Sequence, residues 1–232
     1  MTARRLVIAI DGPAASGKSS TAHAVAERLN LQHVDSGSLY RALTAVALAA
    51  AVPPVPDSWP EAELLAQVSR VGLRNEGREC APTIDGAPAG DAIRSAEVTR
   101  RVSAVAAVPA VRAWVNDQVR RMAEVQDLVV DGRDIGTAVF PDAALKVFLV
   151  ADPRERARRR LVQRLGRTPA EAEIAQEAER LVERDARDAT QTVPARDAVV
   201  MDTTHLTQAE QVDRIVALAR ALTHGDDVSS AG

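Results

Sequence analysis

Short apolar runs alternate along this chain with longer segments in which apolar residues recur every three or four positions. The short runs, which predict strands, are residues 6–10, a stretch ending at Asp35, 128–131, 144–150 and 198–202. The helical patterns cover about residues 19–29, 39–51, 61–70, 95–107, 109–125 and 207–222, and two more begin near 152 and 168. Such alternation is typical of a parallel sheet covered by helices on both faces. We therefore expect an α/β fold, with residues 198–202 as a last buried strand.

Several predicted helices have recognisable end signals. Prolines within residues 52–57 stop the helix that begins near residue 39, because proline removes a donor and clashes with the preceding turn. Residues 152–153, Asp-Pro, suit an N-cap and a first helical position. Two further helix starts carry capping boxes, Thr168 with Glu171 and Thr207 with Glu210.

The pattern changes between the predicted helices in the middle of the chain. Two β-like pieces, residues 71–75 and 81–85, are broken by the turn signals Glu76-Gly77 and Asp85-Gly86. Residues 62–94 are therefore predicted to be a small, partly β insert. The remaining boundaries follow as a core of about residues 4–61 and 95–222 in a single domain over 1–222, with a flexible tail at 223–232.

A glycine-bounded segment between the first strand and the first helix carries the strongest chemical signal. The segment reads Gly12, Pro13, Ala14, Ala15, Ser16, Gly17, Lys18 and Ser19. Strand, glycine-rich loop and helix are the context of a phosphate-binding P-loop, in which successive backbone N–H groups point at one anion. Lys18 then reaches the β- and γ-phosphates, and the Ser19 hydroxyl can ligate Mg²⁺. The segment predicts binding of a nucleoside triphosphate.

Composition narrows the range of partners and cellular compartments to be expected for this protein. The chain has 232 residues, 46% hydrophobic and 26% charged, with a net charge of −3, so no global basic field argues for a nucleic-acid polymer or a membrane surface as partner. Of 29 basic residues only Lys18 and Lys146 are lysines, so a lysine at the P-loop position stands out. Cys80 is the one cysteine, and neither a signal peptide nor a membrane span is recognisable, so we expect a cytoplasmic protein.

Acidic and basic residues gather where the predicted strands end. Asp11, Asp35, Asp131 and Asp202 all fall at carboxyl ends of strands, the edge at which α/β sheets bind ligands. Asp131 is expected to order water around Mg²⁺. Arg41 and Arg133 follow two of these strands, and residues 154–167 hold seven arginines. We expect most of the seven to form a solvated helix face and two or three to close over the triphosphate, as a helical lid over about residues 154–190.

Several other functions lack their signatures. A GTPase would need an Asn-Lys-x-Asp segment, and neither lysine follows an asparagine. His23 suits a helix surface, and His33 and His205 have no spacing that suggests a metal site. Trp59 and Trp114 are expected to be packing residues, because aromatics at 2% of the chain give little support for a base-stacking platform.

Four segments in this order resemble the bacterial cytidylate kinase family. They are Ile-Asp-Gly-Pro-Ala-Ala-Ser-Gly-Lys-Ser at 10–19, Asp-Ser-Gly-Ser-Leu-Tyr-Arg at 35–41, Asp-Gly-Arg-Asp-Ile-Gly-Thr at 131–137 and Arg-Asp-x-x-Asp at 184–188. The likeness runs from about residue 5 to 222. It implies a phosphotransferase of pyrimidine nucleotide metabolism that transfers the γ-phosphoryl group of ATP, with Mg²⁺, to CMP or dCMP, and it makes residues 62–94 an NMP-binding insert.

The resemblance also assigns roles to residues. The catalytic set it implies is Lys18, Arg133 and Arg160, and ATP would bind at residues 12–19 together with Ser20. Arg41 and Arg133 would hold the acceptor phosphate. The cytosine edge would be read by Ser103, Arg112 and Asp134, and the sugar by Ser36, Arg184 and Asp188. A carboxylate paired with an arginine complements cytosine, whose N4 amine donates, and disfavours uracil, whose O4 cannot donate.

One position departs from the family pattern. Where the family often has a further nucleotide-contacting arginine, three residues after Asp188, this chain has Gln191. Either Gln191 makes a neutral hydrogen bond, or Arg187 or Arg196 replaces the missing contact. We expect somewhat weaker acceptor binding rather than lost activity.

Two other functions remain open from the residues. One is a P-loop kinase for another small acceptor, of the adenylate or shikimate type. The other is a binding protein whose ATP-bound state controls a partner, a class that has no use for a second anion site. No exposed apolar stripe demands a partner chain, so we expect a monomer.

Overall fold

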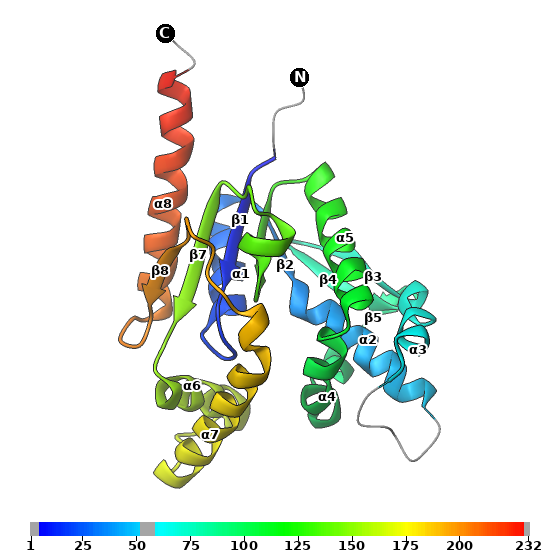
Figure 1. Ribbon diagram of the computed structural model, residues 1–232. Helices are drawn as coiled ribbons and strands as arrows, with labels where there is room; N and C mark the ends of the chain where they lie inside the picture. The colour runs from blue at the N-terminus through cyan, green and yellow to red at the C-terminus, as the bar shows by residue number, and fades with distance from the viewer. Residues whose placement is uncertain (1–4, 52–58, 230–232) are drawn as a thin grey trace.

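A computed structural model describes residues 5–51 and 59–229. Its centre is one eight-stranded sheet in the order β3-β4-β2-β6-β1-β7-β8, with β5 paired to β4 (Figure 1). The strands are β1 (Val7–Asp11), β2 (Gln32–Asp35), β3 (Val71–Glu76), β4 (Glu79–Ile84), β5 (Ala87–Pro88), β6 (Leu128–Gly132), β7 (Leu145–Val150) and β8 (Val199–Asp202). From β4 through β2, β6, β1 and β7 to β8 all neighbours are parallel, which confirms the predicted α/β class.

Helices cover both faces of the sheet. They are α1 (Lys18–Leu29), α2 (Ser36–Ala50), α3 (Glu61–Leu65), α4 (Ala96–Ala106), α5 (Pro109–Val125), α6 (Pro153–Leu165), α7 (Glu171–Asp188) and α8 (Gln208–Ser229). In β1, Val7 and Ala9 face the cluster formed with α2, α4 and α5, whereas Ile8 and Ile10 face the cluster formed with α1 and α8. The alternation of side chains along a strand thus divides the apolar core into two layers.

The two β-like pieces predicted within residues 62–94 are confirmed as strands, β3 and β4, and they belong to the main sheet. Chain reversal at Gly77, with φ +61°, lets β3 and β4 pair antiparallel. The start of β4 lies parallel to β2, where Glu79 is opposite His33. Residues 71–88 therefore extend the edge of the sheet on the side of the strand that ends at Asp35.

The last strand is not buried as predicted. Val199 and Val200 are 39% and 58% exposed, and within β8 only Met201 is buried. The apolar run was interpreted as a buried strand, but β8 is the terminal strand of the sheet and has β7 as its one neighbour. An apolar run alone does not reveal whether a strand lies inside a sheet or at its edge.

Helix ends agree with the sequence at some positions and differ at others. The caps at Asp152 and Thr207 are confirmed. The predicted start at Thr168 is wrong, because α7 begins at Glu171, and Ala170 donates its N–H to Glu173 Oε2 at 2.7 Å. The predicted end at residue 222 is also wrong, because α8 continues to Ser229. The rest of the predicted tail, 230–232, and the proline stop at residues 52–57 lie outside the described residues.

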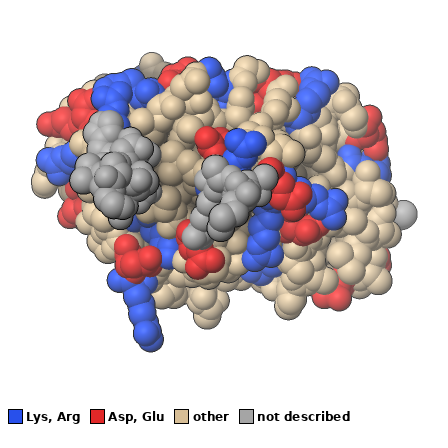
Figure 2. All heavy atoms as spheres, turned by 90° about the horizontal axis from the view of Figure 1, so that it is seen from above, with Lys and Arg blue, Asp and Glu red and all other residues tan. Residues whose placement is uncertain are grey.

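Surface features agree with the composition. Basic and acidic side chains are interspersed on the face seen in Figure 2 rather than gathered by sign. Among the helices of the described ranges, none has the length and apolar character needed to span a membrane.

The first loop glycine carries a close backbone contact. Gly12 has φ +149°, and a Cβ built on it would lie 2.2 Å from the carbonyl oxygen of Leu149 at the end of β7. Only glycine lets the loop leave β1 this close to the neighbouring strand.

Gly12→Ala should therefore lower the free energy of unfolding by at least about 3 kcal/mol, since backbone strain adds to a steric overlap with a rigid carbonyl. Urea unfolding measures the loss. Gly77→Ala is the matched control, because it also has a positive φ but has nothing within 4 Å of the added Cβ. It should cost about 1 kcal/mol. Equal losses at the two positions would contradict the contact.

Candidate functional site

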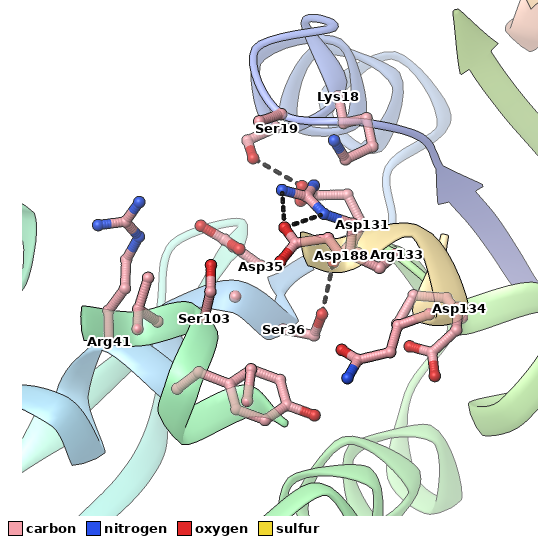
Figure 3. Close-up of a pocket in the computed structure, with 18 of the residues that line it drawn as sticks. Lys18, Ser19, Asp35, Ser36, Arg41, Ser103, Asp131, Arg133, Asp134 and Asp188 are labelled. Carbon is pink, nitrogen blue, oxygen red and sulfur yellow. Dashed lines mark hydrogen bonds and ion pairs between the residues drawn. The ribbon is translucent and has the colours of Figure 1, made fainter. Parts of the chain in front are cut away.

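Two hollows meet at the carboxyl ends of the central strands. The first is a cavity of about 220 Å³ between the P-loop, α2, α4, α5 and α7, shown in Figure 3. The second, about 1070 Å³, lies between the P-loop, α6 and the segment before α8. Both are lined by Ala15, Lys18, Ser19, Arg41, Arg94 and Arg160. Two ligands that occupied the hollows would thus meet at the end of the P-loop.

The P-loop has the curled backbone that its sequence predicts. Gly17 has φ +91° and Ala15 has φ +59°, and α1 begins directly after the loop at Lys18. Lys18 is 7% exposed, and its Nζ donates to the carbonyl oxygen of Pro13 at 2.6 Å. Burial, followed by repulsion from Arg133, lowers the pKa of Lys18 to about 7. An anion in the loop would reverse that shift by stabilising the ammonium form.

Ser19 is connected to a buried carboxylate and a buried imidazole. Its Oγ donates to Asp131 Oδ2 at 2.6 Å, and His33 Nε2 donates to Asp131 Oδ1 at 2.7 Å. Burial alone would lower the pKa of His33, but the hydrogen bond to Asp131 and the negative charges of Asp131, Asp35 and Glu79 together outweigh burial and raise it. Both oxygens of Asp131 are thereby held in place beneath Ser19.

The contact of His33 with Asp131 was not predicted from the sequence. In the sheet, His33 is opposite Val129 and Asp35 is opposite Asp131, because β2 and β6 are parallel neighbours. The strand order was not available from the sequence, and the register between β2 and β6 is the signal that would have placed His33 beside Asp131.

A second buried carboxylate shapes the segment after β6. Asp11 accepts the N–H groups of Ile135 and Gly136, each at 2.8 Å, at the start of a π-helical turn, Ile135–Val139. Burial raises the pKa of Asp11 to about 6. The two hydrogen bonds fix the backbone immediately after Arg133 and Asp134. They therefore also fix the backbone positions from which these two side chains extend.

One side of the smaller cavity holds a paired arginine and carboxylate. Arg112, on α5, forms an ion pair with Asp134, and its Nη1 donates to Gln191 Oε1 at 2.7 Å. Ser103, on α4, lines the same cavity. For the arginine contact missing at position 191, we considered Gln191 itself, Arg187 and Arg196. Gln191 lines the cavity, whereas Arg187 and Arg196 are exposed and do not line it.

A second group of charges lines the same cavity. Arg133 donates to the carbonyl oxygen of Gly12 at 3.1 Å and to Asp188 Oδ2 at 3.4 Å. Arg184, one helical turn before Asp188, lies 3.6 Å from the same oxygen. Burial, followed by repulsion from Arg133, lowers the pKa of Arg184 to about 10. Ser36 donates to the backbone oxygen of Asp131 at 2.8 Å.

Arg41 and Arg160 stand where the two hollows meet. Arg41 donates to Thr99 Oγ1 at 3.0 Å, and burial lowers its pKa. Arg160, on α6, pairs with Glu177 at 2.9 Å. Among the seven arginines of the segment, Arg154, Arg158, Arg164 and Arg167 are more than half exposed, as expected for a solvated face.

The cavity brings together nearly every residue that the sequence singles out. It is lined by Lys18, Ser19, Ser36, Arg41, Ser103, Arg112, Asp131, Arg133, Asp134, Arg160, Arg184 and Asp188. Ser16, Gly17 and Ser20 line the larger hollow, whereas Gly12 and Pro13 line neither and accept hydrogen bonds through their carbonyl oxygens. Tyr40, Arg94 and Asn116 also line the cavity and were not predicted.

The charge of the cavity is unbalanced. Seven arginine and lysine side chains line it with four aspartates, and Asp35 is one of the four. Burial and repulsion from Asp131 raise the pKa of Asp35 to about 6, so part of the negative charge is also suppressed near neutral pH. Such a site favours anionic ligands, and its two lobes suit two of them.

Comparison with known proteins agrees with this geometry. The sequence model of the family described as cytidylate kinase matches residues 8–221. A bifunctional pantoate ligase/cytidylate kinase of Synechococcus sp. (strain JA-3-3Ab) is 45% identical over 228 residues, which cover 94% of this chain and 41% of that protein. The chain thus spans about two fifths of the length of that relative.

Other relatives, two cytidylate kinases among them, match over nearly their whole length. The cytidylate kinase of Chromobacterium violaceum is 42% identical over 90% of this chain and 93% of its own. The cytidylate kinase of Thermus thermophilus is 43% identical over 93% of this chain and 99% of its own.

The lowered pKa of Lys18 has a measurable consequence. At pH 8 the side chain of the free protein is mostly neutral, and a bound polyphosphate favours its charged form. Binding of tripolyphosphate at pH 8 should therefore take up about one proton more than in Lys18→Arg, whose guanidinium stays charged. Affinity should fall as pH rises from about 7 to 9. Calorimetry in buffers of different ionisation enthalpy measures the uptake, and equal uptake by the two proteins would contradict the assignment.

Proposed function

The chain belongs to the cytidylate kinase family, and we propose that it transfers the γ-phosphoryl group of ATP to CMP or dCMP, giving CDP or dCDP and ADP. The observation that carries the proposal is a single cavity that Lys18 of the P-loop lines together with Arg133 and with the ion pair of Arg112 and Asp134. A binding protein with one nucleotide has no need of this second cationic lobe.

The ion pair of Arg112 and Asp134 supports selection of cytosine. Cytosine presents an N4 amine donor beside N3 and O2 acceptors, so a carboxylate and a guanidinium side by side match its edge. Ser103 lines the same cavity. Uracil would set its O4 acceptor against the Asp134 carboxylate, and a buried charge without its partner costs about 1–3 kcal/mol.

Charge stabilisation accounts for the transfer step. Arg41 and Arg133 would hold the acceptor phosphate, while Lys18 and the backbone N–H groups of residues 15–20 would hold the donor tail and Arg160 would cover the reacting groups. The acceptor phosphate has a second pKa of about 6 and is largely ionised at neutral pH, so no general base is required. The work of the protein is positioning and neutralisation of negative charge.

The sugar would lie along the α7 side. Ser36, on α2, and Arg184 and Asp188, on α7, line the cavity together with the Arg112–Asp134 pair. Asp188 can accept from sugar hydroxyls, and its contact with Arg133 links that recognition to the phosphate-holding arginine.

Magnesium fits the side chains beside the P-loop. Ser19 and Asp131 offer hard oxygen ligands, and within the described ranges no group of three or more His, Cys, Asp or Glu forms a metal cage. Mg²⁺ commonly binds one or two protein oxygens plus substrate phosphates. Ser19 would hold it directly and Asp131 through water, and the ion would supply charge neutralisation between the phosphates.

The proposed activity is tested by ADP release with CMP, dCMP, UMP and AMP as acceptors. CMP and dCMP should be phosphorylated with higher kcat/KM than UMP and AMP. Asp134→Asn should reduce the ratio of kcat/KM for CMP over UMP at least about tenfold, because the charge that matches the N4 amine is lost. Asp117→Asn, on the exposed face of α5, should keep the ratio. Equal or better turnover of UMP or AMP by the native protein would overturn the substrate class.

Position 191 gives a second test. A cation there would form charge-assisted contacts with the bound nucleotide, which are about twice as strong as those of a neutral amide. Gln191→Arg should therefore lower the KM for CMP, by about fivefold, with Gln67→Arg as a control of equal charge on the insert. An unchanged KM in Gln191→Arg would argue against a nucleotide contact at this position.

A further inference from the structure

Arg156 is a buried cation that the proposed transfer does not use. It lies on α6 among exposed arginines, yet it is 4% exposed. Its Nε donates to the carbonyl oxygen of Ala151 at 3.1 Å, and its Nη1 donates to the carbonyl oxygen of Ala14 at 2.9 Å. The same nitrogen lies 2.7 Å from Asp185 Oδ2 on α7. One guanidinium thus joins both lid helices to the P-loop.

Asp185 completes the connection from the other side. Its Oδ1 accepts the N–H of Ala14 at 3.3 Å. The N–H and the carbonyl oxygen of Ala14 are therefore both held by the ion pair of Arg156 and Asp185. Because Ala14 is in the phosphate-binding loop, a change in the position of that loop is transmitted directly to this pair.

Apolar packing also connects Ala14 of the P-loop to α6 and α7. Ala14 belongs to a buried cluster with residues of α6 and α7, namely Ala157, Leu161, Ile174, Ala178 and Leu181. Figure 1 shows these two helices beyond the carboxyl ends of the strands, with α7 leading back toward the sheet. The lid helices and this part of the P-loop therefore form one packed unit.

The same turn of α7 also reaches the acceptor cavity. Arg184 and Asp188 flank Asp185 in sequence and line that cavity, and Asp188 contacts Arg133 at 3.4 Å. Arg133 in turn donates to the carbonyl oxygen of Gly12. A closed path thus runs from Ala14 through Asp185 and α7 to Asp188, Arg133 and back to the P-loop.

We propose that Arg156 and Asp185 are positioning residues that couple the two nucleotide sites, so that phosphates bound in the P-loop fix the α7 turn carrying Arg184 and Asp188. The inference rests on the proposed function, because it needs a nucleotide in each hollow. Neither residue needs to touch a nucleotide, and the coupling is reciprocal, as for any two linked binding sites.

The coupling is measured as the ratio of the calorimetric Kd for CMP without and with a saturating non-hydrolysable ATP analogue. The native protein should give a ratio of about fivefold or more. Arg156→Lys keeps a buried charge but lacks the fork that reaches Ala151, Ala14 and Asp185 together. Its ratio should fall toward one, while its Kd for CMP alone changes by less than about twofold. Arg154→Lys, on the exposed face beside Glu171, should keep the native ratio.

A second variant protects the test against loss of the fold. Asp185→Asn keeps an oxygen for the N–H of Ala14 but removes the charge opposite Arg156, and thermal unfolding reports whether each variant is folded. A native ratio in either folded variant, or a ratio of one in the native protein, would overturn the coupling. Failure of the native protein to bind CMP at all would instead overturn the proposed function.

Discussion

Electrostatic repulsion among cations that are partly removed from water is the constraint on which the site depends. Lys18, Arg133 and Arg184 lie close enough that Arg133 contributes to the lowered pKa of both other groups, after burial. Nearby carboxylates offset only part of this positive charge. Asp188 is shared between Arg133 and Arg184, and the raised pKa of Asp35 reduces its negative charge near neutral pH. The fold holds this arrangement through backbone anchors such as the two N–H groups bound by Asp11. Anions that enter the cavity relieve the repulsion.

The P-loop contacts the sheet and the helices α6 and α7, and so connects these elements to one another. Its first glycine lies against the end of β7, its Ala14 is held by side chains of α6 and α7, and its Ser19 is connected to Asp131 on β6. Rigid contacts therefore lead from one short loop to the sheet, to α6 and α7, and to the smaller cavity. Transfer between two bound phosphates requires such common positioning, because a small misplacement of the reacting groups is costly.

Local sequence rules were sufficient for the parts of the structure that depend on short segments. The P-loop between β1 and α1, the hairpin at Gly77 and the caps at Asp152 and Thr207 follow from residues next to one another in the chain. The resemblance to a family named the residues that we propose bind the acceptor, and the structure gathers these residues in one cavity. Contacts between distant segments could not be predicted in this way. His33 and Arg156 looked like unremarkable members of a strand and of a charged helix, and only the strand order and the packing of α6 give them their partners.

The central claim is that the sheet edge holds two separate anionic nucleotides at once. Calorimetric titration with CMP, followed by titration of the CMP-saturated protein with a non-hydrolysable ATP analogue, tests it most directly. The account predicts one molecule of each bound per chain, with the analogue binding undiminished in the presence of CMP. Displacement of CMP by the analogue, with a total of one nucleotide per chain, would contradict it.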